Sequence, residues 1–307
     1  MHTLTLYIAR EGLKHQTGHN HPECPERLQA IYSLLDKSPF MALPQIPAPE
    51  AELRWIKRAH DPRYLERLEN AIPDYGQIHI DNDTILSPGS WTAALTAAGA
   101  VCQAVDDVIA GKTLRAFCAT RPPGHHAFPD HSEGFCLLNN IFIGALHAQS
   151  LGCARVAIVD FDVHHGNGSD AMTRQHENIF YASTHQWPLY PGTGQPEDNI
   201  PNRVLNVPMS AGEGSLPFRH IYEQNILPAV RHFQPDLLMI SAGFDAHKDD
   251  PLAQIMLETA DFGWITTELA KLAQECCGGR LVSVLEGGYN LAALSDCVSS
   301  HLKNLMA

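Results

Sequence analysis

The sequence predicts an α/β fold in which helices cover both faces of an open, mostly parallel β-sheet. Two observations predict it. Short apolar runs typical of buried strands alternate with longer helical segments, and residues with acid, base or metal-binding side chains follow the ends of these runs. Parallel strands need long crossover connections, which the helical segments supply. In such sheets, ligands bind beyond the carboxyl ends of the strands.

The predicted strands and helices follow from the residue pattern. The strands cover residues 115–119, 155–160, 178–183, 236–242 and 280–286, and the helices cover 90–110, 136–151, 215–233 and 258–275. The strand runs are short, mostly apolar and rich in β-branched residues, which indicates buried strands. The Ala-rich helix ends at Gly111, a residue type that commonly terminates helices. We interpret the Pro-rich stretch 39–49 as a surface loop.

Composition indicates one globular domain over residues 1–307. Hydrophobic residues make up 44% and charged residues 18% of the chain, and there is no repeat or Gly/Ser linker. The net charge of -13, with no basic run, argues against a surface that binds nucleic acid. We find neither a leader pattern nor an apolar run long enough to cross a membrane, so we expect a cytoplasmic protein. The eight cysteines form no CxxC pair and are expected to be reduced and mostly buried.

The first group of chemically active residues follows the strand 155–160. Asp160, Asp162 and His164 alternate, so in an extended segment their side chains project to the same side. One alternative is that they cap the next helix. Three such groups at one strand end would, however, repel one another without a cation, and Gly166 and Gly168 permit the tight backbone of a metal site.

A third metal ligand is expected after the strand 236–242. Asp245 follows this strand, so it meets Asp162 and His164 at the same edge of the sheet. Two carboxylates and one imidazole leave a coordination position open, which is typical of a catalytic zinc. We interpret His247 as a surface group or a group that supports the ligands.

Two further strand ends carry candidates for proton transfer. His125 and His126 follow two prolines after the strand 115–119, and imidazoles titrate near neutral pH. Metal ligation or an inert loop role are the alternatives. Tyr289 follows Glu286 and two glycines after the last strand, where a phenol can donate to an oxyanion. A plain turn is the alternative for this GGY segment.

Five motifs together carry a family resemblance: RPPGHHA, GFCLLNN, DFDVHHGNG, SAGFDAHKDDP and EGGYN. In order, spacing and strand context they resemble the zinc-dependent histone deacetylase family, from His21 to Asn290. The phrases GFDA, HHGNG and EGGYN are most similar to the class II branch, which includes bacterial deacetylase-like and acetylpolyamine amidohydrolase proteins. The resemblance implies the arginase/deacetylase fold with one zinc ion on Asp162, His164 and Asp245.

The resemblance also implies catalytic roles. His126 would be the general base and later the acid, His125 its electrostatic partner, and Tyr289 the group that polarises the carbonyl. Asp160 would hold His125. Asn167 stands where some relatives carry an aspartate that holds the second histidine, and an amide there stabilises a His126 cation less well.

The resemblance implies two further sites. A structural potassium ion would be held by Asp160, Asp162, His164, Ser183 and Thr184, although Ser183 could equally just end a strand. The walls of a narrow substrate tunnel would be formed by Gly134, Phe135, Tyr190 and Leu252, with Asp81 as a carboxylate at the rim. Core packing for the aromatic pair and a solvated loop charge for Asp81 are the alternatives.

The expected function is hydrolysis of an N-acetylated amine, with acetyl-lysine in proteins or peptides as the first choice. Leu252 stands after Asp250-Pro251, where some polyamine-selective relatives have a glutamate, which favours acetyl-lysine over an acetylpolyamine. A catalytically silent acyl-lysine-binding module is opposed by the intact set of acid, base and metal-binding residues. A two-metal hydrolase of arginase type would need further ligands. An oligomer is compatible with the sequence.

Overall fold

The computed structural model describes residues 2–307, so that only Met1 of the predicted domain lies outside the described part. Within it, an eight-stranded sheet has the order β2-β1-β5-β10-β9-β6-β7-β8, and all neighbouring strands are parallel. The strands are β1 (His2–Ile8), β2 (Gln45–Pro47), β5 (Thr113–Ala119), β6 (Val156–Asp160), β7 (Ile179–Gln186), β8 (Val204–Met209), β9 (Leu237–Ala242) and β10 (Leu281–Leu285). A small hairpin pairs β3 (Ile78–His79) with β4 (Ile85–Leu86). The predicted sheet is confirmed.

The five predicted strands correspond to β5, β6, β7, β9 and β10, and the remaining strands of the sheet were missed. β1 alternates Thr with Leu, and β8 contains Asn206 and Pro208, so neither has a continuous apolar run. The interpretation of 39–49 as a loop was wrong for β2. This strand pairs only with β1 at the edge of the sheet, where a proline that lacks an N–H is tolerated.

The helices alternate with the strands. They are α1 (Pro25–Leu35), α2 (Leu53–Ile56), α3 (Pro62–Asn70), α4 (Ser90–Ile109), α5 (Asn140–Ser150), α6 (Asn167–Thr173), α7 (Ser215–Ile221), α8 (Leu227–Phe233), α9 (Thr259–Cys277) and α10 (Leu291–Met306). The predicted helix 136–151 begins only at Asn140, because the side chain of Asn139 caps it by accepting from the Phe142 amide. A π-helical turn, Tyr222–Ile226, separates α7 from α8.

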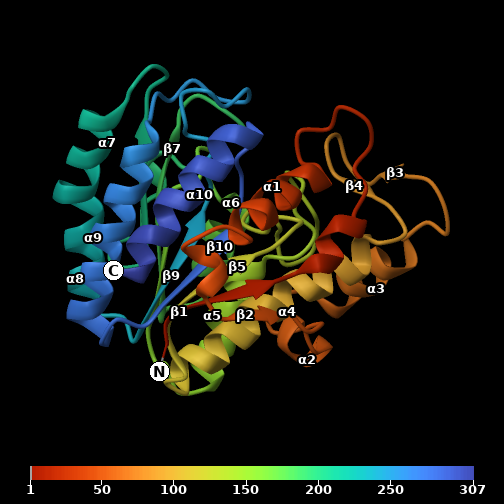
Figure 1. The fold of residues 1–307 in the computed structure, drawn as a ribbon, viewed down its shortest axis with the longest axis horizontal. Coiled ribbons are helices and arrows are strands. Elements are labelled where there is room, and N and C mark those ends of the chain that lie inside the picture. The colour runs from red at the N-terminus through yellow and green to blue at the C-terminus, as the bar shows by residue number, and fades with distance from the viewer. Residues whose placement is uncertain (1) are drawn as a thin grey trace.

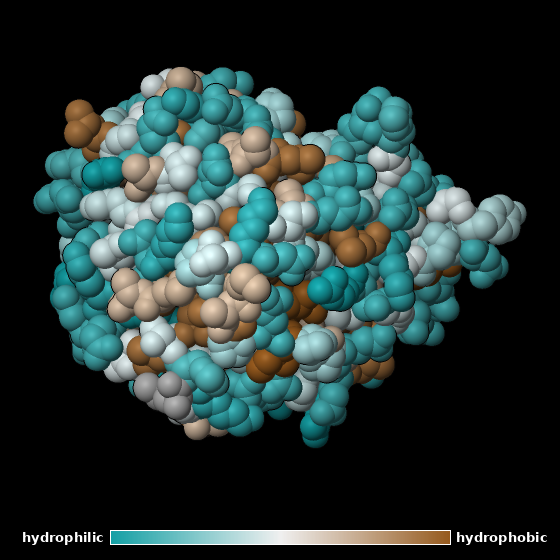
Figure 2. Space-filling model, in the orientation of Figure 1, coloured by the Kyte–Doolittle hydropathy of each residue, from teal (hydrophilic) through white to brown (hydrophobic). Residues whose placement is uncertain are grey.

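Two hydrophobic cores lie on opposite faces of the sheet. One is formed with α1, α9 and α10, and the other with α4 and α5. Figure 1 shows α7 to α10 gathered on one side of the strands and α4 with α5 on the other. Helix α4 is long and apolar enough to span a membrane, but 78% of its most apolar window is buried, as in a core helix. Figure 2 shows hydrophilic residues over most of one face, with hydrophobic residues scattered among them.

The strand order brings distant motifs together. β5, β10, β9 and β6 are consecutive in the sheet, although the chain passes through them in the order β5, β6, β9, β10. Each of the four is followed by one of the histidine, aspartate or tyrosine motifs. The carboxyl ends of neighbouring parallel strands share one edge, so these motifs converge there.

Candidate active site

Asp162, His164 and Asp245 form a cluster with the geometry of a metal site. Their ligand atoms all lie within 4.8 Å of one another, and all three residues are buried. Nδ1 of His164 lies 3.2 Å from Oδ1 of Asp162 and 3.1 Å from Oδ2 of Asp245. Burial and the neighbouring Asp162 raise the pKa of Asp245 to about 7. Two buried carboxylates and an imidazole fit a divalent cation, which would offset this charge.

Backbone amides orient the two carboxylates. Asp162 accepts from the amide of Gly287 at 2.8 Å, and Asp245 accepts from the amide of Val163 at 2.9 Å. A Cβ at Gly287 would lie 2.1 Å from Oδ2 of Asp245, so only glycine allows the loop after β10 to approach the cluster this closely. Gly287 therefore serves the metal site and not Tyr289 alone.

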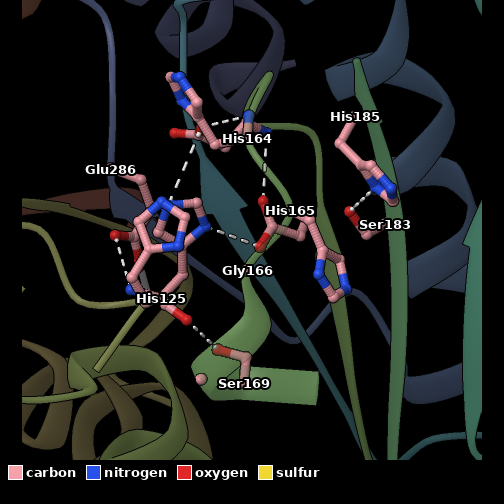
Figure 3. A network of polar contacts seen from close by, with 12 residues as sticks. His125, His164, His165, Gly166, Ser169, Ser183, His185 and Glu286 are labelled. Atoms are coloured by element: carbon pink, nitrogen blue, oxygen red, sulfur yellow. Dashed lines mark hydrogen bonds and ion pairs between the residues drawn. The ribbon is translucent and has the colours of Figure 1, made fainter. Parts of the chain in front are cut away.

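His125 is held by charged and backbone groups (Figure 3). Its Nδ1 lies 3.0 Å from Oδ2 of Asp160, which also accepts from the hydroxyl of Tyr181 at 3.0 Å. The carboxylate of Glu286 accepts from the backbone amides of Gly124 and His125. Burial alone would lower the pKa of His125, but the nearby Asp162 and Asp160 outweigh it and raise that pKa to about 10.

His126 has a neutral partner. Its Nδ1 lies 2.8 Å from Oδ1 of Asn167, and the two histidine rings are 4.0 Å apart between centroids. Burial and the nearby His125 and His164 hold the pKa of His126 well below its usual range. His126 is therefore the neutral imidazole of the pair, which suits a proton acceptor.

Tyr289 lies beside the metal cluster on a loop held by a buried arginine. Arg27 donates to the carbonyls of Gly288 and Glu286, and its guanidinium lies 4.9 Å from the centroid of the Tyr289 ring. Arg27 is itself paired with Glu23 at 3.1 Å. Burial raises the pKa of the Tyr289 phenol well above its usual value, so it stays protonated and able to donate a hydrogen bond.

A cavity of about 260 Å³ opens onto these groups. It is lined by His126, His164, Tyr289, Gly134, Phe135, Tyr190, Leu252, Leu189 and Asp83. All four predicted wall residues lie there, and Leu189 was missed. The predicted rim carboxylate, Asp81, instead accepts from the amides of Asp83 and Thr84 and so stabilises its own turn. Asp83 takes the place at the cavity, and burial and Asp81 raise its pKa to about 6.

Three other sequence-based predictions have mixed outcomes. Ser183 lies beside Asp160 in the register of β7 with β6, and its hydroxyl contacts Nδ1 of His185 at 2.9 Å (Figure 3). Thr184 follows it and contacts the hydroxyl of Tyr222. His247 is only 5% exposed, so its interpretation as a surface group was wrong. All eight cysteines are free and six are buried, as predicted.

Sequence reasoning missed the carboxylates that support the site. Glu23 lies in the buried pair with Arg27, and Glu286 lies behind His125. Glu133 accepts from the Asn167 amide at 3.0 Å and from the Tyr190 hydroxyl at 3.2 Å. The only signal was that Glu133 and Glu286 adjoin glycines of recognised motifs.

Comparison with known proteins agrees with this geometry. Residues 21–305 match the model of the histone deacetylase domain. The chain is 40% identical to an uncharacterized protein of Synechocystis, over 99% of both chains. It is 37% identical to the histone deacetylase-like amidohydrolase of Pseudomonas aeruginosa, over 96% of this chain and 79% of the relative.

A solved structure shows the same fold. The HDA15 HD domain superposes with a TM-score of 0.94 and 32% sequence identity, and the match covers 99% of this chain and 88% of that chain. The family is zinc-dependent, and Asp162, His164 and Asp245 provide a possible site for the ion. The chain belongs to the histone deacetylase family and is an amidohydrolase of deacetylase type with the arginase/deacetylase-like α/β fold.

Proposed function

We propose that this protein is a zinc-dependent deacetylase that hydrolyses acetyl-lysine in proteins or peptides. The observation that carries the proposal is that His164 of the Asp162, His164 and Asp245 cluster lines one cavity together with His126 and Tyr289. Apolar and aromatic walls above them suit the aliphatic chain of an acylated lysine. Leu252 on the wall leaves that side of the mouth uncharged.

The three cluster residues would hold the zinc ion, which supplies a lowered pKa for the attacking water and polarisation of the amide oxygen. His126 accepts a proton from the water as its oxygen bonds to the carbonyl carbon, and then gives the proton to the departing nitrogen. Tyr289 donates a hydrogen bond to the developing oxyanion. The C–N bond breaks, and acetate and the free amine leave.

His125 has an electrostatic role in this scheme. Asp162 and its partner Asp160 keep it protonated, and the His125 ring lies against the His126 ring. A potassium ion near Asp160 and Ser183, with Asp162, His164 and Thr184 as further ligands, is part of the proposal. Replacing potassium by sodium during assay and unfolding would test it, with lower stability expected in sodium.

The test of the function is a turnover assay of the full chain with an acetyl-lysine peptide, with acetylputrescine and with acetylspermidine. We expect peptide turnover that a chelator abolishes and added zinc restores. Tyr289→Phe should lower kcat about 10²- to 10³-fold, the usual effect of removing one oxyanion donor, while the bound zinc, measured by elemental analysis, stays unchanged. Metal-independent turnover, or none on either substrate class, would refute the proposal.

An acetylpolyamine is the second candidate substrate, because Asp83 places a carboxylate at the cavity where a second cationic centre would lie. If this candidate is right, Asp83→Asn lowers kcat/KM for acetylspermidine more than for an uncharged acetamide of similar length.

The eight free thiols suit a reducing compartment, and we propose the cytoplasm, to be checked by cell fractionation.

A further inference from the structure

Glu133 connects the proton acceptor to the wall of the cavity. Its Oε1 accepts from Nδ2 of Asn167 at 3.0 Å and from the hydroxyl of Tyr190 at 3.2 Å. Asn167 in turn contacts Nδ1 of His126. The Glu133 side chain is 29% exposed, so this carboxylate stands at the solvent side of a chain of contacts that ends on a buried imidazole.

The carboxylate determines which way the Asn167 amide points. An ionised carboxylate only accepts hydrogen bonds, so the NH₂ group of Asn167 has to face Glu133. The opposite orientation would place the amide oxygen against the carboxylate and the NH₂ group against the backbone N–H of Gly168. In the orientation observed, the amide of Gly168 donates to Oδ1 of Asn167 at 3.1 Å. Glu133 and Gly168 thus favour the same orientation.

The orientation of Asn167 determines the tautomer of His126. Because Oδ1 is an acceptor, Nδ1 of His126 carries the hydrogen and donates it. In a neutral imidazole the other nitrogen, Nε2, is then left with its lone pair, and the ring lines the cavity. This is the tautomer that can take a proton from water. A carboxylate beyond the amide also polarises it, which strengthens Oδ1 as an acceptor.

Glu133 also begins the turn that forms one wall. Its backbone exchanges hydrogen bonds with Cys136 across Gly134 and Phe135. Gly134 has φ +56°, and a Cβ there would lie 2.5 Å from Cδ2 of His126, so the turn packs directly on the imidazole. The bond from Tyr190 to Glu133 joins the facing wall to the same carboxylate.

We propose that Glu133 is a positioning residue that acts through Asn167 to hold His126 in the Nδ1–H tautomer and that secures Tyr190 in the cavity wall. The inference rests on the proposed function, because it matters only if Nε2 of His126 is the proton acceptor.

An exchange of charge between positions 133 and 167 tests the proposal. Glu133→Ala should lower kcat about tenfold, the equivalent of one hydrogen bond of roughly 1.4 kcal/mol. Glu133→Gln keeps an acceptor for Asn167 and should lower kcat about threefold. Asn167→Asp should lower kcat more than either, because two carboxylates then face each other across the former 3.0 Å contact.

The decisive variant combines Glu133→Gln with Asn167→Asp. The glutamine NH₂ group donates to the new aspartate, so kcat should rise well above that of Asn167→Asp alone. Glu133→Gln is thus expected to lower kcat when residue 167 is Asn and to raise kcat when residue 167 is Asp. A purely structural role does not produce this reversal. The matched control is Glu66→Gln on α3, which makes the same exchange at an exposed carboxylate of another element. It should leave kcat unchanged.

A second readout does not depend on turnover. The ¹⁵N shifts of His126 in the zinc-loaded protein should report the Nδ1–H tautomer in the wild type and a mixture in Glu133→Ala. Melting temperature identifies a variant that fails to fold. If the wild type is active but the variants show neither the reversal nor a change of the His126 tautomer, this inference alone is overturned. A wild type that turns over neither substrate class would overturn the proposed function, and the tautomer measurement would then still decide the role of Glu133.

Discussion

His125 and His126 are adjacent, identical and both buried, yet the structure gives them opposite protonation states. His125 lies against the carboxylate of Asp160, and its pKa is raised to about 10. His126 lies against the amide of Asn167, and burial and the neighbouring imidazoles hold its pKa well below the usual range. Because both residues are buried, the charges around them separate their pKa values: Asp162 and Asp160 act on His125, whereas His126 faces a neutral amide and two other imidazoles.

Because their protonation states differ, the two histidines can have different roles in catalysis. A histidine that stays charged at pH 7 stabilises negative charge, whereas one that stays neutral accepts a proton. The sequence HH alone carries no such distinction. It arises because His125 faces the end of β6 and His126 faces the start of α6.

The largest effect is expected from the removal of His126, the proton acceptor of the pair. His126→Ala should lower kcat by about 10³-fold, within the range for loss of a general base, with zinc content unchanged. His125→Ala should lower kcat by only about 10- to 100-fold, because it removes charge stabilisation and no proton transfer. Steady-state kinetics and elemental analysis of both variants check this. Equal losses would mean that the two histidines share one role.

A smaller effect should come from making the partner of His125 neutral. Asp160→Asn gives His125 an amide partner like that of His126 and removes one of the two aspartates that raise its pKa, so the pKa of His125 should fall from about 10. Because less of the charge on His125 is then kept at pH 7, kcat should fall, by up to about tenfold. NMR titration of His125 measures the pKa directly.

The control for this variant is Tyr181→Phe. It removes the hydrogen bond from the Tyr181 hydroxyl to Asp160 but keeps the carboxylate. The pKa of His125 should then stay high, and kcat should change less than in Asp160→Asn. A pKa that stays high in Asp160→Asn as well would show that Asp162 alone keeps His125 charged.

The smallest expected effect concerns a buried histidine outside the site that also has neutral partners. His301 is fully buried between the hydroxyls of Thr266 and Ser283, two neutral partners, and burial lowers its pKa to about 3. Between pH 3 and 6.5 the unfolded chain therefore binds the proton and the folded chain does not. The stability linked to His301 is complete above pH 6.5 and is lost as the pH falls toward 3.

Urea unfolding of the wild type and of His301→Gln between pH 4 and 8 measures this linkage. The free energy of unfolding of the wild type should fall more steeply below pH 6.5, by at most about 1.4 kcal/mol per pH unit. Other buried histidines contribute equally to both proteins, so the difference in slope isolates His301. Parallel curves would show that His301 takes up a proton inside the fold.

Local sequence was enough to predict the parallel sheet, five of its strands and the residues of the metal cluster. The reason is that a buried parallel strand is mostly apolar and that functional residues follow its carboxyl end. Strands without that pattern, such as β1 and β8, escaped detection, and so did the edge strand β2. Asp81 and Asp83 are two residues apart in one turn, and only the direction of each side chain decides that Asp83, and not Asp81, lines the cavity.

The sequence by itself determined which groups meet: the aspartates, histidines and tyrosine are placed at strand ends, and strand ends meet at one edge. Tertiary structure alone decided what each group faces. The order β5-β10-β9-β6 places His125 beside Asp160, and the connection between β5 and α5 places Glu133 beside Asn167. Protonation and tautomer depend on neighbours within hydrogen-bond distance, and those neighbours are far apart in the chain.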